Sequence, residues 1–96
     1  MSGKIAGRVV AITESGNLVT DITAAPLSGA PTDERVAVRC GEHVTNGIFS
    51  PDHGQPDFTF LAVLSDKGQL QLEVVCDNAS LMLGIGVGET VVVEWP

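Results

Sequence analysis

The segment GNLVTDI, residues 16–22, follows the apolar run VVAI, residues 9–12, near the start of the chain. Gly and Asn tolerate the left-handed backbone that a narrow hairpin requires. The two segments therefore predict a strand over residues 5–13, a tight turn, and a returning strand over residues 17–23.

Short apolar runs continue along the rest of the chain, separated by Gly and Pro residues that are typical of turns. Residues 69–74, QLQLEV, alternate polar and apolar side chains, which is the period of a strand with one wet face. A short helix is expected near residues 78–83, because Asp77 or Asn78 can cap its start and Gly84 can end it. Further strands are expected at residues 35–40, 43–49, 58–64 and 90–95, with loops at residues 24–33 and 50–57.

Six to eight short strands at this spacing, joined by mostly short connections, predict an all-β fold. The expected architecture is a small antiparallel β-barrel with one short helix, since a barrel removes exposed sheet edges. The 96 residues suffice for one modest core, so we expect a single domain over residues 1–96. The side chains expected in this core, or on the faces just outside it, are Val9, Val10, Ile12, Leu18, Val36, Val38, Phe60, Ala62, Leu70, Leu72, Val91 and Val93.

The composition is that of a folded, acidic domain. Hydrophobic residues make up 44% of the chain, and 12 acidic residues against 5 basic ones give a net charge of −7. Phosphate backbones are bound by clustered basic side chains, and here these are scattered, so no nucleic-acid partner is expected. No apolar run is long enough for a membrane span, and the N-terminus lacks the apolar segment of a secretory signal. We therefore expect a cytoplasmic protein that does not enter a membrane.

Two cysteines, Cys40 and Cys76, lie far apart in the sequence and belong to no C-x-x-C pair. In a reducing compartment the simpler interpretation is two buried or half-buried free thiols. Cys40 also lies near His43 and His53, in the strings CGEH and PDHG, and Cys and His are ligands of zinc. Their spacing matches no zinc module, however, and a polar loop that carries His is the simpler interpretation.

The string GRVVAITESGNLVTDI, residues 7–22, resembles the start of the C-terminal domain of the S-adenosylmethionine (SAM) hydroxide adenosyltransferase family, whose relatives include the SAM-dependent chlorinase and fluorinase. The family pattern there is close to G-x-V-x-x-I-D-x-F-G-N-L-x-T-N-I. LSDKGQLQLEV, residues 64–74, is similar to the family's G-S-x-G-x-L-E-I-A-V. DNAS, residues 77–80, and LGIGVGETVVV, residues 83–93, are similar to later family segments in the same order.

The resemblance implies a small antiparallel barrel that cradles SAM against the larger N-terminal domain of a neighbouring subunit in a trimer. An amide can pair with an adenine edge, an aromatic ring can stack on a purine, and N–H groups at a helix start favour polar ligand groups. SAM or adenosine is thus the expected ligand, and no cofactor is expected. The ligand-binding positions that the resemblance carries over are Asn17, Phe49, Ser65, Asn78 and Ala79.

The chain also departs from the family. Thr13 and Ser15 stand where the family has Asp and Phe, and Asp66 stands where some members have Arg. The large N-terminal domain, with the Asp, Arg and His that activate water, has no counterpart in these 96 residues. We therefore expect no catalysis by this chain alone, and only weak binding of SAM.

Three functional hypotheses follow. The first is a barrel module that acts by protein association, as a homo-oligomer or with a separate catalytic-domain protein, and an exposed apolar patch would favour it. The second is a weak binder of SAM or adenosine, or one half of a split SAM-hydrolysing enzyme, favoured by a pocket framed by Asn17 and Asn78. The third is a metal-dependent enzyme that uses Cys40, His43 and His53, favoured by a convergence of these side chains.

Overall fold

The computed structural model describes residues 3–96 and confirms the all-β prediction. Its strands join into a single sheet that curls into a nearly closed barrel, with two short helices at its ends. The elements are β1 (Gly3–Ile12), β2 (Leu18–Thr23), α1 (Ala24–Leu27), β3 (Ala37–Cys40), β4 (His43–Asn46), β5 (Ile48–Phe49), β6 (Phe60–Leu64), β7 (Gln69–Val74), α2 (Ala79–Leu83) and β8 (Thr90–Trp95).

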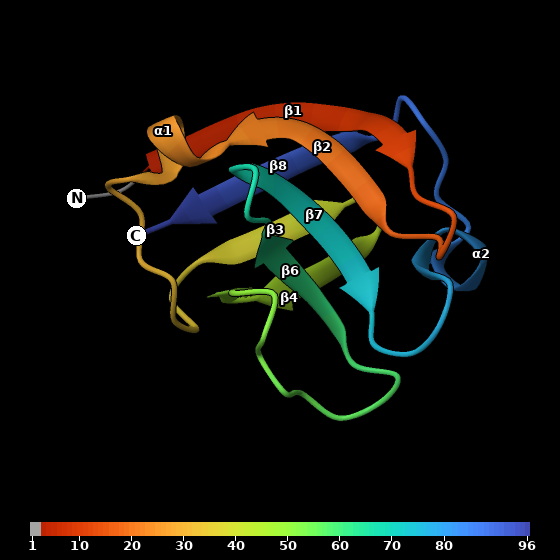
Figure 1. Ribbon diagram of the computed structural model, residues 1–96. Coiled ribbons are helices and arrows are strands. Elements are labelled where there is room, and N and C mark those ends of the chain that lie inside the picture. The colour runs from red at the N-terminus through yellow and green to blue at the C-terminus, as the bar shows by residue number, and fades with distance from the viewer. Residues whose placement is uncertain (1–2) are drawn as a thin grey trace.

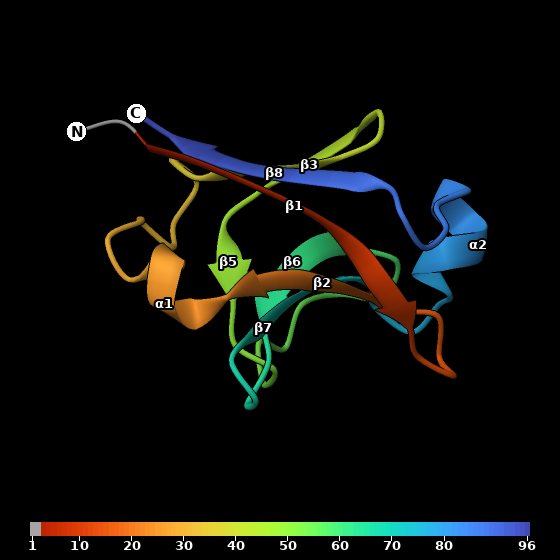
Figure 2. The same ribbon diagram turned by 90° about the horizontal axis from the view of Figure 1, so that it is seen from above.

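The strand order in the sheet is β4-β3-β8-β1-β2-β7-β6-β5. Viewed from above, β1, β8 and β3 form one layer, and β2, β7, β6 and β5 form the other (Figure 2). β1 belongs to both layers, since its residues from Gly3 to Arg8 pair with β8 and those from Val9 to Ile12 pair with β2. The register shifts between Val9 and Ala11, and such a bulge bends a strand from one layer to the other.

The turn at residues 13–17 forms as the sequence predicts. Gly16 has a φ of +90°, and its N–H donates to the Thr13 carbonyl over 2.9 Å. The Thr13 N–H donates to the Asn17 carbonyl over 3.0 Å, which closes the hairpin between β1 and β2. Gly16 alone adopts the left-handed backbone of this turn, and it directs β2 back along β1.

The barrel is not antiparallel throughout. β5 pairs with β6 in parallel, because the chain crosses over through residues 50–59 before it enters β6. Beside this pair, Thr45 of β4 donates its hydroxyl hydrogen to the Phe60 carbonyl of β6 over 3.0 Å. This side-chain contact joins β4, at one end of the sheet order, to β6, which is next to the other end, and no backbone ladder joins these two strands.

The core follows the predicted alternation. Leu70, Leu72 and Val74 point into the barrel and are 0%, 0% and 3% exposed. Most of the other expected core residues are also buried, but Val10 and Ile12 point outward and are 46% and 39% exposed. Val9 is 1% exposed, so alternation along the strand places Val10 on the outer face, and all three residues that follow Val9 in β1 are exposed.

The helix near residues 78–83 is confirmed as α2. The Asn78 side chain accepts a hydrogen bond from the Leu81 N–H over 3.0 Å, and Gly84 ends the helix with a φ of +68°. A second one-turn helix, α1, lies in the segment expected to be a loop, where the Leu27 side chain is buried against the core. The burial of Leu27 stabilises this helical turn, which has no side-chain cap that could have predicted it from the sequence.

Across residues 3–96, no helix is both long and apolar enough to cross a membrane.

Candidate functional site

A groove on the outer face of the β2–β7–β6 layer brings together two of the predicted ligand residues. We call it the Asn17 groove, and it consists of two adjoining hollows of about 430 and 300 Å³ that share Asn17 and Glu73. Ser65 lines the larger hollow and Asp77 lines the smaller one. A volume of several hundred Å³ matches the usual size of small-molecule sites.

The hairpin turn positions Asn17. The Asn17 N–H donates to the Thr13 hydroxyl over 3.0 Å, and this hydroxyl contacts the Ser15 hydroxyl at 3.1 Å. These bonds fix the backbone of the turn and leave the half-buried Asn17 side chain on the wall of the groove.

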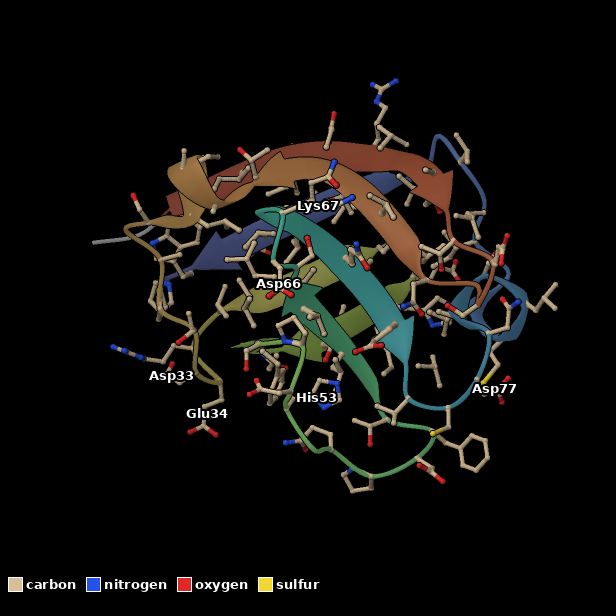
Figure 3. The ribbon with its side chains drawn as sticks, viewed as in Figure 1. Asp33, Glu34, His53, Asp66, Lys67 and Asp77 are labelled. Atoms are coloured by element: carbon tan, nitrogen blue, oxygen red, sulfur yellow. The ribbon has the colours of Figure 1, made fainter. Side chains whose placement is uncertain are left out.

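Ser65 and its neighbours come from the β6–β7 turn. Ser65 and Gln69 close this turn with a 2.9 Å backbone hydrogen bond, and the Ser65 hydroxyl accepts a second bond from the Gln69 N–H over 3.2 Å. The turn also carries Asp66 and Lys67, which Figure 3 shows at the tip between β6 and β7. Because the Ser65 hydroxyl holds the turn, its first role is structural.

The other three predicted residues do not line the groove. Asn78 caps α2 and lies against Gly16, and Ala79 is fully buried. Phe49 is half-buried in β5 and packs edge-on against His53, with ring centroids 6.1 Å apart. The expected pocket framed by Asn17 and Asn78 therefore has Asn17 and Asp77 as its walls instead.

Glu73 lines both hollows but is not among the predicted site residues. Its Oε1 lies 2.9 Å from Nε2 of His53. The only sequence signal was its place on the wet face of residues 69–74, since the partner histidine is 20 positions away. The sequence suggests a role for His53 only as a metal ligand, in the third hypothesis.

Cys40, His43 and His53 each have a separate environment. Cys40 lies in the core, His43 faces the Leu83 carbonyl at 3.1 Å, and His53 is bound to Glu73. Within residues 3–96 no group of three or more His, Cys, Asp or Glu side chains is arranged to hold a metal ion. The structure therefore does not bring the residues of the third hypothesis together.

The two cysteines are free thiols in different surroundings. Burial, reinforced by the Glu89 carboxylate, raises the pKa of the Cys40 thiol to about 11. The expectation of burial is wrong for Cys76, which is exposed in the turn after β7, where its backbone has a φ of +59°. A hydrogen bond to Asp57, followed by the charge of that carboxylate, raises the pKa of the Cys76 thiol.

The raised pKa values and the different exposures of the two thiols predict how each reacts. At neutral pH a disulfide reagent such as DTNB should modify Cys76 slowly and leave Cys40 unmodified, because the thiolate is the reactive form. Asp57→Asn removes the charge that raises the pKa of Cys76 and should speed its modification, whereas Asp52→Asn should not. Two equivalents that react quickly without denaturant would contradict this assignment.

Several exposed apolar side chains lie on α2, on the loop that follows it and on the last residues of β1. The Gly88 N–H donates to the Val9 carbonyl over 2.8 Å, and the Ser80 N–H donates to the Gly16 carbonyl over 3.0 Å. The first bond holds the loop after α2 against β1, and the second holds α2 against the turn between β1 and β2, so α2 lies at this end of the barrel (Figure 1). We call the exposed residues of this region the apolar end; they are Val10, Ile12, Leu81, Met82 and Val87.

Two further hollows, of about 570 and 620 Å³, adjoin Trp95 and Arg35 at the other end of the barrel. Arg35 forms a 3.0 Å ion pair with Asp33 and holds the pKa of that carboxyl below its usual value. Although these hollows are larger, no residue predicted for a site lines them. The Asn17 groove, where predicted residues from distant segments meet, is therefore the stronger candidate.

No protein-family model and no curated protein matches the chain. Solved structures do match it. An uncharacterized conserved protein from Thermotoga maritima aligns with 94% of this chain at a TM-score of 0.77 and 22% identity, and 35% of that protein is covered. A conserved hypothetical protein from Thermus thermophilus aligns with 92% of this chain at a TM-score of 0.72 and 24% identity, and 34% of it is covered. The chain thus spans about a third of the length of either protein and shares their fold over that part.

Proposed function

We propose that this chain is a barrel module related to the C-terminal domain of the SAM hydroxide adenosyltransferases, and that it acts by associating with other protein subunits. The barrel fold agrees with what the resemblance implies. The structural neighbours add support, because in them the same fold is about a third of a longer chain. In both neighbours the barrel is therefore joined to further polypeptide, against which a face of the barrel can pack.

The observation that carries the proposal is the apolar end. Leu81 is 80% exposed, Val87 is 64% exposed and Met82 is 54% exposed, all at one end of the barrel. Monomeric proteins rarely expose large contiguous apolar patches. Burial of such surface contributes roughly 25 cal/mol per Å² to a complex, and the entropic cost of association opposes this gain. A second copy of the chain is the first partner, and a separate catalytic-domain protein is the alternative one.

Light scattering tests self-association. At micromolar concentration the wild type should have the mass of a dimer or a trimer, compared with 10.0 kDa for one chain. The double variant Leu81→Asp/Met82→Asp should be a monomer, because it places two charges in the interface. Val44→Asp is the matched control, since Val44 is 46% exposed but lies on β4, outside the apolar end. A wild-type mass near that of one chain would contradict self-association.

The second candidate function is weak binding of SAM or adenosine in the Asn17 groove. One observation favours it specifically: Asn17 and Ser65, which the resemblance assigns to the ligand, line the same hollow although 48 positions separate them. The groove lacks the aromatic wall and the Arg of the family pattern, since Ser15 and Asp66 stand there. Each loss weakens binding by on the order of 1–3 kcal/mol.

Titration with SAM tests this candidate. We expect a dissociation constant near the millimolar range, and Asn17→Ala should weaken binding by roughly tenfold through loss of a buried hydrogen bond. Asn46→Ala is the control, because Asn46 lies on β4 and donates to the Glu34 carbonyl. Calorimetry or NMR shift titration gives the constants. Low-micromolar affinity would contradict the idea of a weakened site.

A further inference from the structure

The side chains of His53 and Glu73 form a contact that is more buried than a typical surface ion pair. The His53 side chain is only 10% exposed and that of Glu73 is 22% exposed, at a 2.9 Å separation of Nε2 and Oε1. The ring is also held on its other side, since Nδ1 of His53 accepts the Gln55 N–H over 2.9 Å, and Phe49 packs against it edge-on. Contacts from three directions thus fix the imidazole.

These contacts determine where the proton lies. A ring nitrogen that accepts a hydrogen bond carries no hydrogen, so Nδ1 of His53 is bare and Nε2 carries the N–H. The Nε2–H group therefore donates to Glu73. In this arrangement a neutral imidazole orients the carboxylate without cancelling its negative charge. Glu73 is left as a fixed anionic acceptor on the wall of the groove.

The position of β7 beside β6 also brings Glu73 within reach of His53. Glu73 of β7 is the register partner of Leu61 of β6, which is 1% exposed although it lies outside the main core cluster. His53 lies on the loop that follows β5, and Figure 3 places it in front of β6. The loop thus covers the outer face of β6 and brings His53 to the edge of the groove.

The groove as a whole is negative. Its charged side chains are Asp66, Glu73 and Asp77 against Lys67, which leaves two negative charges in excess. Figure 3 shows Asp66 and Lys67 at one end of β7 and Asp77 at the other. Glu73 belongs to both hollows, so a ligand in either of them meets its carboxylate.

We infer that Glu73, held in place by His53, makes the Asn17 groove selective for ligands that carry a positive charge. His53 acts as a positioning residue, and Glu73 contacts the ligand. This inference rests on the second candidate function, that the groove binds a small ligand. The inference assigns His53 the role of positioning Glu73, and neither proposed function gives this histidine a role.

Two probes that differ by one charge test the inference. SAM carries a positively charged sulfonium, whereas S-adenosylhomocysteine lacks the methyl group and has a neutral sulfur. The wild type should bind SAM about five- to tenfold more tightly than the neutral analogue, as expected for one close charge pair at a partly exposed site. Glu73→Gln keeps the shape and should bring this ratio near one, with the greater loss in SAM affinity.

Control variants separate a specific effect from a structural one. Glu34→Gln removes an exposed carboxylate outside the groove and should leave the ratio unchanged. His53→Ala should lower the ratio because Glu73 loses its support, and His53→Gln, which can still donate to the carboxylate, should restore part of it. Heteronuclear NMR spectra of each variant report the fold and the affinities together.

Each outcome is decisive. Equal binding of both probes by the wild type would overturn the selectivity while leaving the groove a ligand site. An unchanged ratio in Glu73→Gln would overturn the role of Glu73. Failure of the wild type to bind either probe at several millimolar would overturn both this inference and the second candidate function.

Discussion

Replacing Leu72 by Ala is expected to lower the free energy of unfolding by about 3 kcal/mol. Leu72 is fully buried, and its register partners, Leu18 on β2 and Ala62 on β6, are fully buried as well. A leucine truncated in such a place loses its burial and leaves a cavity, which costs roughly 2–5 kcal/mol in measured series. The total free energy of unfolding of a domain is roughly 5–15 kcal/mol, so this loss is a large share of it.

Equilibrium denaturation in urea measures this loss. Gln71→Ala is the matched control, because Gln71 is the preceding residue of β7 and points to the wet face. It should change the stability by no more than about 0.5 kcal/mol. A loss below about 1 kcal/mol for Leu72→Ala would mean that the barrel interior is not packed as described.

Gly16→Ala is expected to cost about 2–3 kcal/mol, from two sources. A φ of +90° is strained for any residue with a Cβ, which accounts for the first part. The added Cβ would also collide with the side-chain amide of Asn78, whose oxygen caps α2. The change therefore disturbs the hairpin and the helix cap together, and caps alone contribute about 1 kcal/mol.

Thermal unfolding followed by circular dichroism tests Gly16→Ala. For a chain of this length the loss corresponds to a fall in Tm on the order of 10–20 °C. Gly29→Ala serves as the control, because an added Cβ there meets no atom within 4 Å and Gly29 is not held at a positive φ. Similar Tm values for the two variants would show that the turn tolerates a side chain and that α2 does not depend on it.

The candidate site was only partly predictable. The family resemblance supplies Asn17 and Ser65 as ligand residues, and the structure places both on the wall of one hollow. Glu73 was missed because its significance depends on His53, which reaches it only after the loop of residues 50–59 folds over β6. The resemblance also supplies Phe49, as an aromatic residue where the family has one, but its ring packs against that same histidine and does not line the groove.

Local patterns in the sequence are enough to predict most of the individual strands and one of the two helices of residues 3–96. Hydrophobic alternation, turn glycines and the Asn78 cap act over a few residues, so they specified the strands, the β1–β2 hairpin and α2. The bulge in β1, the parallel pairing of β5 and β6, and the burial of Leu27 in α1 arise instead from contacts between distant segments. These features, like the contact between His53 and Glu73, depend on which distant strands become neighbours when the sheet curls. That outcome is set by packing of the whole chain, and no short window of residues contains it.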